Sequence, residues 1–223
     1  MQHAGEDFLR GVLVWPMTPW REIPLADYEG HMALSEVGQA DYLANTLERL
    51  VREYAPRSVA VIGCAGGNGF GRLADLEVPR VVGIDINPAF LAEAKRRYAG
   101  ALQCLELVCC DIASAGCPFE PVEFIFAALI FEYTSVPASL ASLRMSLRPG
   151  GHVAAVLQLP HASIGVVTPS PFTSLAKLGP VLRLIPPVEF QQDAEQAGFR
   201  LKSSLAHVLP SGKAFQEILL DAC

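Results

Sequence analysis

The stretch SVAVIGCAGGNGF, residues 58–70, decides the fold that we expect for this chain. An apolar, β-branched run over 58–62 leads into a segment in which glycine occupies positions 63, 66, 67 and 69. Strands that are apolar throughout are typical of parallel sheets buried on both faces. Glycines allow a sharp bend and let a ligand approach without meeting a Cβ atom. Ligands of open α/β sheets bind beyond the carboxyl ends of the strands, so the stretch predicts a strand followed by a ligand-binding turn.

Strand and helix patterns alternate on either side of this stretch. Apolar strand-like runs lie at 80–86, 105–111, 122–129 and 152–159, and helical spacings lie at 40–54, 69–76, 87–99, 136–147 and 188–197. Alternation with short connections indicates βαβ units. The runs at 199–209 and 214–222 are separated by Pro-Ser-Gly-Lys, which predicts a tight reversal. We therefore expect an α/β fold with a doubly wound, mostly parallel seven-stranded sheet and an antiparallel last strand.

The chain divides into an N-terminal cap segment, 1–38, and a single ligand-binding domain, 39–223. Prolines at 16, 19 and 24 disfavour a long helix in the cap, which we expect to be irregular and to lie on the main body. Residues 160–187 are proline-rich and are expected to cover a cleft.

The composition favours a globular protein without a nucleic-acid or membrane partner. Of the 223 residues, 51% are hydrophobic and 18% charged, and the net charge is −6. No lysine- or arginine-rich run is present, which argues against a phosphate backbone as the main ligand. The longest strongly apolar run, 124–131, is far too short to span a bilayer, and the N-terminus lacks a signal-peptide pattern. We expect a cytoplasmic protein that is a monomer or a homodimer.

Six cysteines are present, at 64, 104, 109, 110, 117 and 223, and none forms a Cys-x-x-Cys pair. We expect small buried thiols in a reducing compartment. A reactive or soft-metal cluster over 104–117 and disulfides are the alternatives. The sequence holds no paired-acid cluster suited to Mg²⁺, so no metal is expected.

Two kinds of ligand are compatible with the glycine-rich turn. A dinucleotide fold requires Gly-x-Gly-x-x-Gly, and this chain matches it poorly because Ala65 takes the second glycine position. The other kind is a nucleoside ligand without phosphates. Asp85, at the end of the next strand, can accept hydrogen bonds from both ribose hydroxyls in either case. Asp111 follows the third strand, where it can accept from an adenine amino group while Ile112 packs on the ring.

The motifs in this order resemble those of the class I S-adenosylmethionine-dependent methyltransferases. SVAVIGCAGGNG, VVGIDIN and CCDIAS are similar to the family's first three motifs, and VEFIFAALIFEY and SLRMSLRPGGHVAAVLQ to its fourth and fifth strands with their flanking segments. Two positions depart from the family pattern. Val61 stands where the family carries an acid near the end of the first strand, and Ala65 is tolerable in the loop if it avoids positive φ.

The resemblance implies S-adenosylmethionine as cofactor and assigns its contacts by position. The methionine part would lie on the turn, the ribose on Asp85, and the adenine between the residues that follow the second and third strands. The expected cofactor-binding residues are Tyr28, Gly63, Cys64, Ala65, Gly67, Asp85, Ile86, Asp111, Ile112, Ala127 and Ala128.

Methyl transfer from a sulfonium is an in-line displacement, so alignment and exclusion of water matter most. A base is needed only if the acceptor starts protonated. The candidate catalytic residues are His161, Glu132, Tyr133 and His31. The apolar, proline-rich segments 12–31 and 160–187 favour a small, partly hydrophobic acceptor. A non-catalytic module that binds S-adenosylmethionine or S-adenosylhomocysteine and an NAD(P)-linked oxidoreductase are the alternatives.

Overall fold

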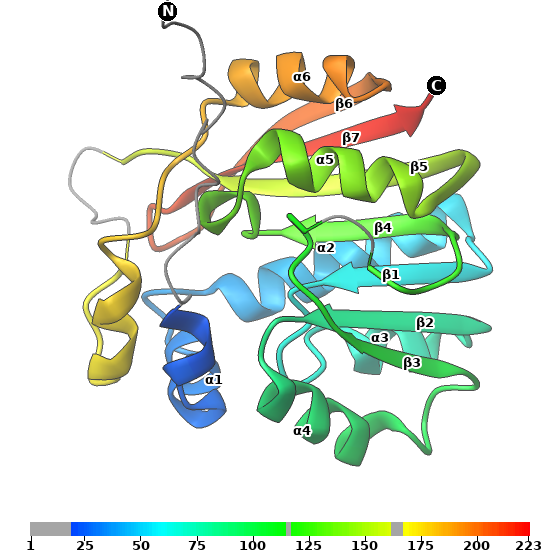
Figure 1. Ribbon diagram of the computed structural model, residues 1–223. Helices are drawn as coiled ribbons and strands as arrows, with labels where there is room; N and C mark the ends of the chain where they lie inside the picture. Colours follow the sequence, from blue (N-terminus) through cyan, green and yellow to red (C-terminus); the bar gives the residue numbers. More distant parts are fainter. Residues whose placement is uncertain (1–18, 115–116, 162–166) are drawn as a thin grey trace, which may run out of the picture.

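A computed structural model describes residues 19–114, 117–161 and 167–223 of the chain (Figure 1). Its strands are β1 (Ser58–Ile62), β2 (Arg80–Asp85), β3 (Leu105–Cys109), β4 (Val122–Ala128), β5 (Leu147–Gln158), β6 (Phe199–Val208) and β7 (Ala214–Ala222). Its α-helices are α1 (Leu25–Met32), α2 (Gln39–Tyr54), α3 (Phe70–Asp75), α4 (Pro88–Tyr98), α5 (Val136–Met145) and α6 (Pro187–Gln196). Short 3-10 helices are η1 (Pro19–Glu22), η2 (Phe131–Tyr133) and η3 (Thr173–Leu178).

The strands form one seven-stranded sheet in the order β3-β2-β1-β4-β5-β7-β6. Strands β1 to β5 pair in parallel, whereas β7 runs antiparallel to both β5 and β6. The predicted fold class is therefore confirmed, including the antiparallel last strand. The order in which the strands are added to the sheet reverses between β1 and β4, which places a ligand-binding crevice at their carboxyl ends.

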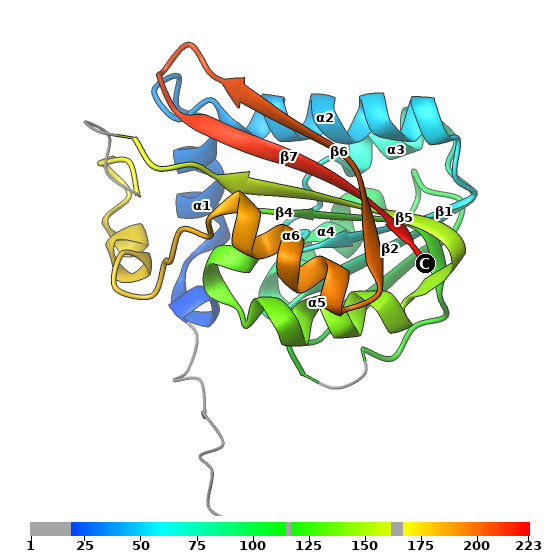
Figure 2. The ribbon, with the colours of Figure 1, turned by 90° about the horizontal axis from the view of Figure 1, so that it is seen from above.

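Helices cover both faces of the sheet, as Figure 2 shows with α2 and α3 on one side and α5 and α6 on the other. Alternate residues of β1 point to opposite faces of the sheet and pack against the helices on each side. Ala60 and Ile62 lie in the core beneath α5 and α6, whereas Val59 and Val61 lie in the core beneath α2, α3 and α4. Every residue of β1 is buried, as its uninterrupted apolar run predicts.

Two local predictions about secondary structure were wrong. The cap is not irregular over 25–32, because Pro24 stands just before the first helical residue and the eight residues of α1 contain no proline. Strand β5 begins at Leu147 and so includes the Arg-Pro-Gly-Gly segment, which lies before the strand-like run expected at 152–159. Leu147 pairs with Val122, and a register shift between Val122 and Phe124 accommodates the added residues.

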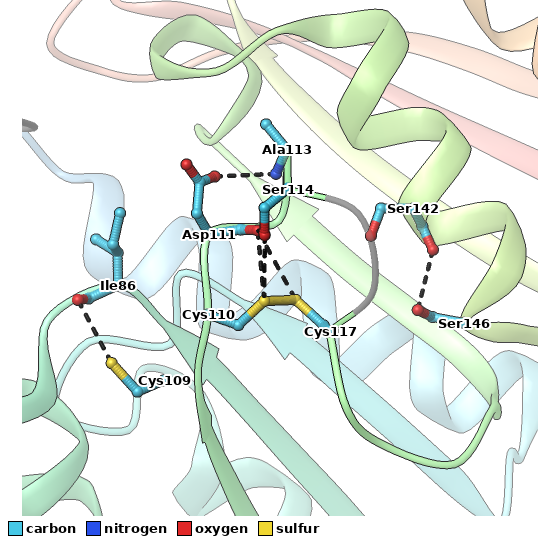
Figure 3. The surroundings of a disulfide bond; sticks show 9 residues. All are labelled: Ile86, Cys109, Cys110, Asp111, Ala113, Ser114, Cys117, Ser142 and Ser146. Atoms are coloured by element: carbon cyan, nitrogen blue, oxygen red, sulfur yellow. Dashed lines mark hydrogen bonds between the residues drawn. A yellow bond between two sulfur atoms is a disulfide. The ribbon is translucent and has the colours of Figure 1, made fainter. Parts of the chain in front are cut away.

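The expectation of buried, reduced thiols was also wrong for most cysteines. Cys110 and Cys117 form a disulfide that closes the segment after β3 (Figure 3). Cys104, Cys109 and Cys223 are exposed, and Cys64 is a buried free thiol. The short spacing along the chain brings Cys110 and Cys117 together because the backbone turns back at Asp111 and Ser114, whose backbone groups are hydrogen-bonded.

Within the described ranges, no helix has the length and apolarity needed to cross a bilayer.

Candidate functional site

A cavity of about 750 Å³ opens at the carboxyl ends of β1, β2 and β4. The residues that line it include the glycine-rich turn with the ends of β2, β3 and β4, the cap, the first half of α2, and an apolar wall formed by residues 167–182. The cap and this wall pack on one another through a small core of Ile23, Leu175 and Leu178. The Ser174 hydroxyl also donates a hydrogen bond of 2.6 Å to Asp27 of α1. The site is therefore roofed by two segments that are far apart in the sequence.

The glycine-rich turn bends away from β1 through residues with positive φ. Gly63 has φ of +69°, and a Cβ atom there would lie 2.2 Å from Ile130 Cδ1. Ala65 has φ of +46°, so our condition that this alanine avoids positive φ is not met. A left-handed conformation costs a residue with a side chain about 1 kcal/mol. The Ala65 amide donates to Asp85 Oδ2 at 2.8 Å, which holds the alanine in this conformation.

Asp85 lies at the end of β2 with its carboxylate against the turn. One oxygen accepts from the Ala65 amide and the other from the Asn87 amide, each at 2.8 Å. The side chain is buried, and this burial raises the pKa of Asp85 in spite of the backbone hydrogen bonds that lower it. Each carboxylate oxygen has a second lone pair, so Asp85 can fix the turn and still accept from a ligand.

The segment after β3 forms the cavity wall beside Asp85, whose carbonyl accepts from the Cys110 amide at 3.1 Å. Asp111 Oδ1 accepts from the Ala113 amide at 2.9 Å, and the Ser114 hydroxyl donates to the Asp111 carbonyl at 2.6 Å (Figure 3). Cys110, Asp111, Ile112 and Ala113 all line the cavity. The disulfide therefore braces the stretch of backbone that carries the predicted adenine contacts.

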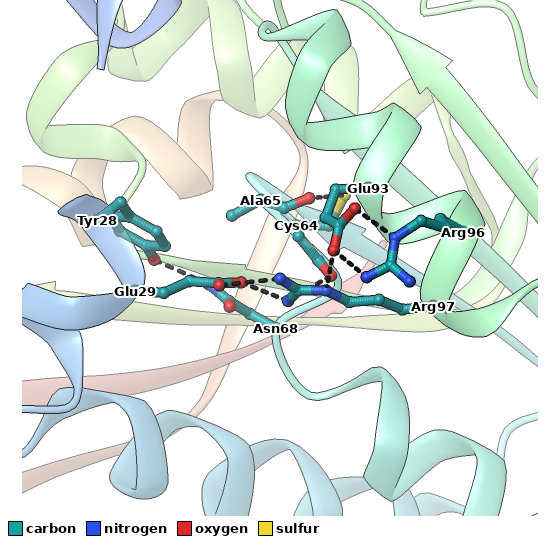
Figure 4. A network of polar contacts seen from close by, with 9 residues as sticks. Tyr28, Glu29, Cys64, Ala65, Asn68, Glu93, Arg96 and Arg97 are labelled. Atoms are coloured by element: carbon teal, nitrogen blue, oxygen red, sulfur yellow. Dashed lines mark hydrogen bonds and ion pairs between the residues drawn. The ribbon is translucent and has the colours of Figure 1, made fainter. Parts of the chain in front are cut away.

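The cap is fastened to the glycine-rich turn by polar contacts (Figure 4). Asn68 Nδ2 donates to the Tyr28 hydroxyl at 2.8 Å. Arg97 of α4 pairs with Glu29 of α1 at 2.5 Å and also donates to the Gly66 carbonyl at 3.4 Å. Burial raises the pKa of Tyr28, so its hydroxyl stays protonated.

Most of the predicted site residues meet in this one cavity. Those that line it are Tyr28, His31, Gly63, Ala65, Gly67, Asp85, Ile86, Asp111, Ile112, Ala128, Glu132 and Tyr133. Three others do not: Cys64 is buried under the turn, Ala127 is buried within the sheet, and His161 is exposed.

Glu132 follows β4 and is almost completely buried, with 2% of its surface exposed. Its Oε1 accepts from the Gln158 amide at 2.7 Å, and Oε2 has no hydrogen-bond partner in the described parts of the chain. Burial raises the pKa of Glu132 to about 7. A carboxyl group with this pKa can take up a proton near neutral pH.

Sequence reasoning missed Lys213, which stands in the connection between β6 and β7. It lines the cavity and is 3% exposed, and burial lowers its pKa to about 8. The pKa of His31 is lowered first by the burial of His31 itself and then by the charge of Lys213. His31 Nδ1 is buried and unpartnered within the described residues. A lysine in a Pro-Ser-Gly-Lys turn is ordinarily solvated, so the sequence carries no signal for this placement.

Comparison with known proteins bears on the same motifs. A family model described as a methyltransferase domain matches residues 59–151, which run from β1 into β5. A trans-aconitate 2-methyltransferase from Methylobacterium nodulans is 32% identical over 138 residues. Residues 59–151 are thus similar to a methyltransferase domain, which supports the resemblance to the class I S-adenosylmethionine-dependent methyltransferases. The matches also support S-adenosylmethionine as the cofactor.

Other relatives carry different names. A tRNA U34 carboxymethyltransferase from a Shewanella species is 28% identical over 138 residues. These matches cover 61% and 60% of this chain, which spans 51% of the first relative and 41% of the second. The crystal structure of the methyltransferase CalH in complex with S-adenosylhomocysteine has the same fold, with a TM-score of 0.65 at 20% identity. That alignment covers 90% of this chain and 62% of CalH.

Proposed function

We propose that this protein is a methyltransferase and that it transfers the methyl group of S-adenosylmethionine to a small, partly hydrophobic acceptor. One observation carries the proposal: the glycine-rich turn, the Asp85 carboxylate and the Asp111–Ile112 pair face a single cavity that continues between apolar walls. The cofactor supplies an activated methyl group on a positively charged sulfur. The residues of this chain need to bind, orient and exclude water.

The residues around the turn fit the cofactor. Asp85 retains free lone pairs for the two ribose hydroxyls while its carboxylate holds Ala65 and Asn87. Ile86 and Ile112 offer apolar surface for the adenine, with Asp111 as acceptor for its amino group. Val61 replaces the expected acid, so backbone carbonyls of the turn would receive the ammonium of the methionine part. The carbonyls of Cys64, Ala65, Gly66 and Gly67 already accept hydrogen bonds within the described residues, which leaves that of Gly63.

The acceptor would lie beyond the sulfur, under the cap and the 167–182 wall. Leu175, Leu178 and Leu182 line this part of the cavity together with Trp20 and Tyr133. Because the roof is closed by packing and by the Ser174–Asp27 hydrogen bond, the space suits a small molecule better than a nucleic acid. The relative named for trans-aconitate supports this assignment, whereas those named for tRNA do not.

Proton transfer, where the acceptor needs it, would fall to Glu132. Its raised pKa and unpartnered Oε2 leave it free to take a proton in a site that water enters poorly. Burial keeps Tyr133 protonated and His31 neutral, so these two would orient the acceptor instead. His161 stays a candidate only for the outer rim, because it is exposed. The boundary between cap and domain at 38/39, the cytoplasmic location and the monomeric or dimeric state stay predictions.

Calorimetry with S-adenosylhomocysteine and with NADH tests the cofactor assignment first. We expect binding of the former and none of the latter, and tighter binding of NADH would contradict the proposal. Incubation with methyl-labelled cofactor and a library of small acceptors tests turnover. Tight cofactor binding with no label transfer to any acceptor would support a binding module instead.

A further inference from the structure

The cavity contains a buried cation that the cofactor assignment does not use. Lys213 lines the cavity with 3% of its surface exposed, and no carboxylate pairs with it in the part of the chain that the structure describes. Uncompensated charges are almost never buried in proteins unless a ligand or another group pairs with them. His31 interacts electrostatically with Lys213, but a histidine cannot supply the negative charge that would compensate the ammonium.

The position of Lys213 in the sheet separates it from the cofactor half of the site. Lys213 directly precedes β7, and Ala214 accepts a hydrogen bond from the Leu159 amide at the end of β5. In the sheet order, β7 is three strands from β1 on the side away from β2 and β3. With strands about 4.8 Å apart, Lys213 starts roughly 14 Å from the strand that leads into the glycine-rich turn. The ribose and adenine contacts lie in the opposite direction, at the ends of β2 and β3.

The β6–β7 turn closes the far end of the cavity against the cap. Figures 1 and 2 show this turn beside the start of α2, and a Cβ atom on Gly38 would lie 3.6 Å from Leu209 of the turn. Gln39, at the start of α2, and Gln158, at the end of β5, also line the cavity. Lys213 and His31 thus form a polar end to a space whose roof is made of leucine and valine side chains.

Resting on the proposed function, we propose that the methyl acceptor carries a carboxylate on an apolar body and that Lys213 binds this carboxylate. The ammonium would pair with the acid group while the apolar part lies against Leu175, Leu178 and Leu182. The pair would fix one end of the acceptor and so present its other end toward the cofactor. His31 is placed to add a hydrogen bond to the same carboxylate.

A second source of a carboxylate is the methionine tail of the cofactor itself. The three-strand offset from β1 favours the acceptor, and the two sources predict different behaviour of a Lys213→Met variant. If Lys213 binds the acceptor, its replacement leaves the affinity for the cofactor unchanged. If Lys213 binds the methionine carboxylate, its replacement lowers that affinity.

The test uses octanoate and octanamide as a matched pair of probes that differ in charge. Calorimetry is performed on the full chain saturated with S-adenosylhomocysteine. We expect octanoate to bind roughly ten-fold or more tightly than octanamide, as a charge-assisted hydrogen bond in a water-poor site implies. Lys213→Met should abolish this preference, and Lys213→Arg should retain much of it. Lys95→Met, which removes an exposed lysine on α4, should leave it unchanged.

The outcomes separate this inference from the proposed function. Failure of the wild-type chain to bind S-adenosylhomocysteine contradicts the proposed function itself. Normal binding of S-adenosylhomocysteine without a preference for octanoate overturns the inference alone. A marked loss of S-adenosylhomocysteine affinity in Lys213→Met also overturns it, since the lysine would then hold the cofactor's carboxylate.

Discussion

Replacing Lys213 by methionine should make the protein more stable. The lysine ammonium is buried without an ion-pair partner in the described structure, and methionine keeps a flexible side chain of similar length without the charge. Burial lowers the pKa of Lys213 from 10.5 to about 8. A shift of this size corresponds to about 3 kcal/mol at 1.36 kcal/mol per pKa unit. Relaxation of the surrounding groups relieves part of this penalty, so we expect a gain of ~2 kcal/mol in the free energy of unfolding near neutral pH.

The gain should depend on pH in a defined direction. Between about pH 8 and 10.5 the unfolded chain binds a proton at position 213 that the folded chain has released, so wild-type stability rises across this window. The variant lacks this titration. The difference in the free energy of unfolding between the two proteins should therefore be largest below pH 8. Above pH 10.5 only the difference in packing between lysine and methionine should remain.

Urea unfolding at a series of pH values, followed by circular dichroism, measures this difference. Lys95→Met serves as the control, because removal of an exposed lysine should change stability by less than about 0.5 kcal/mol at every pH. A Lys213→Met variant that is less stable than the wild type near neutral pH would refute the reasoning. So would a stability difference that stays constant up to pH 10.5, since the ammonium would then not be the source of the penalty.

Four other changes test the remaining features. Asp85→Asn should weaken S-adenosylhomocysteine binding roughly 10- to 100-fold in calorimetry, through lost charge-assisted hydrogen bonds, and an affinity equal to that of the wild type would contradict the ribose assignment. If Glu132 is the proton acceptor, kcat/KM should rise with pH up to about 7, and Glu132→Gln should lack this limb, so persistence of the limb would exclude that role. Cys117→Ser should lower the free energy of unfolding by about 2.5 kcal/mol, as closure of a short loop implies, and raise the Kd for S-adenosylhomocysteine. Glu217 is 2% exposed and its partner Arg49 is half-exposed, so Arg49→Ala leaves a buried charge unpaired and should lower the free energy of unfolding by about 3 kcal/mol in urea. Glu217→Gln should cost clearly less, and equal costs would show that the pair is effectively solvated.

The sequence predicted the sheet well because each strand must satisfy the same demand. Strands buried by helices on both faces require apolar residues throughout, and the runs at 58–62 and 122–128 carry little else. The motifs also predicted where the cavity lies, since a ligand beyond the strand ends requires small residues after β1 and acids after β2 and β3. Asp85 and Asp111 meet in the cavity for that reason.

The features that the sequence did not reveal depend on the path of the chain in space. Helix α1 is too short for a strong periodic signal and follows proline-rich sequence, which masked it. The Cys110–Cys117 bond depends on a turn at Asp111 that no spacing rule predicts. Lys213 is buried because the β6–β7 turn folds against the cap, and only tertiary structure brings those segments together.

The bare bend after β1 serves the cap as well as a ligand. A methyl group on Gly66 would lie 2.6 Å from Glu29 Oε1, 2.8 Å from Leu25 Cδ2 and 3.0 Å from an Arg97 nitrogen, all of them the protein's own atoms. An alanine at this position would thus push α1 outward before it touched any bound nucleoside. A shortened chain that lacked this helix would have room for a larger residue there, whereas Gly63, wedged beneath Ile130, would remain as constrained as before.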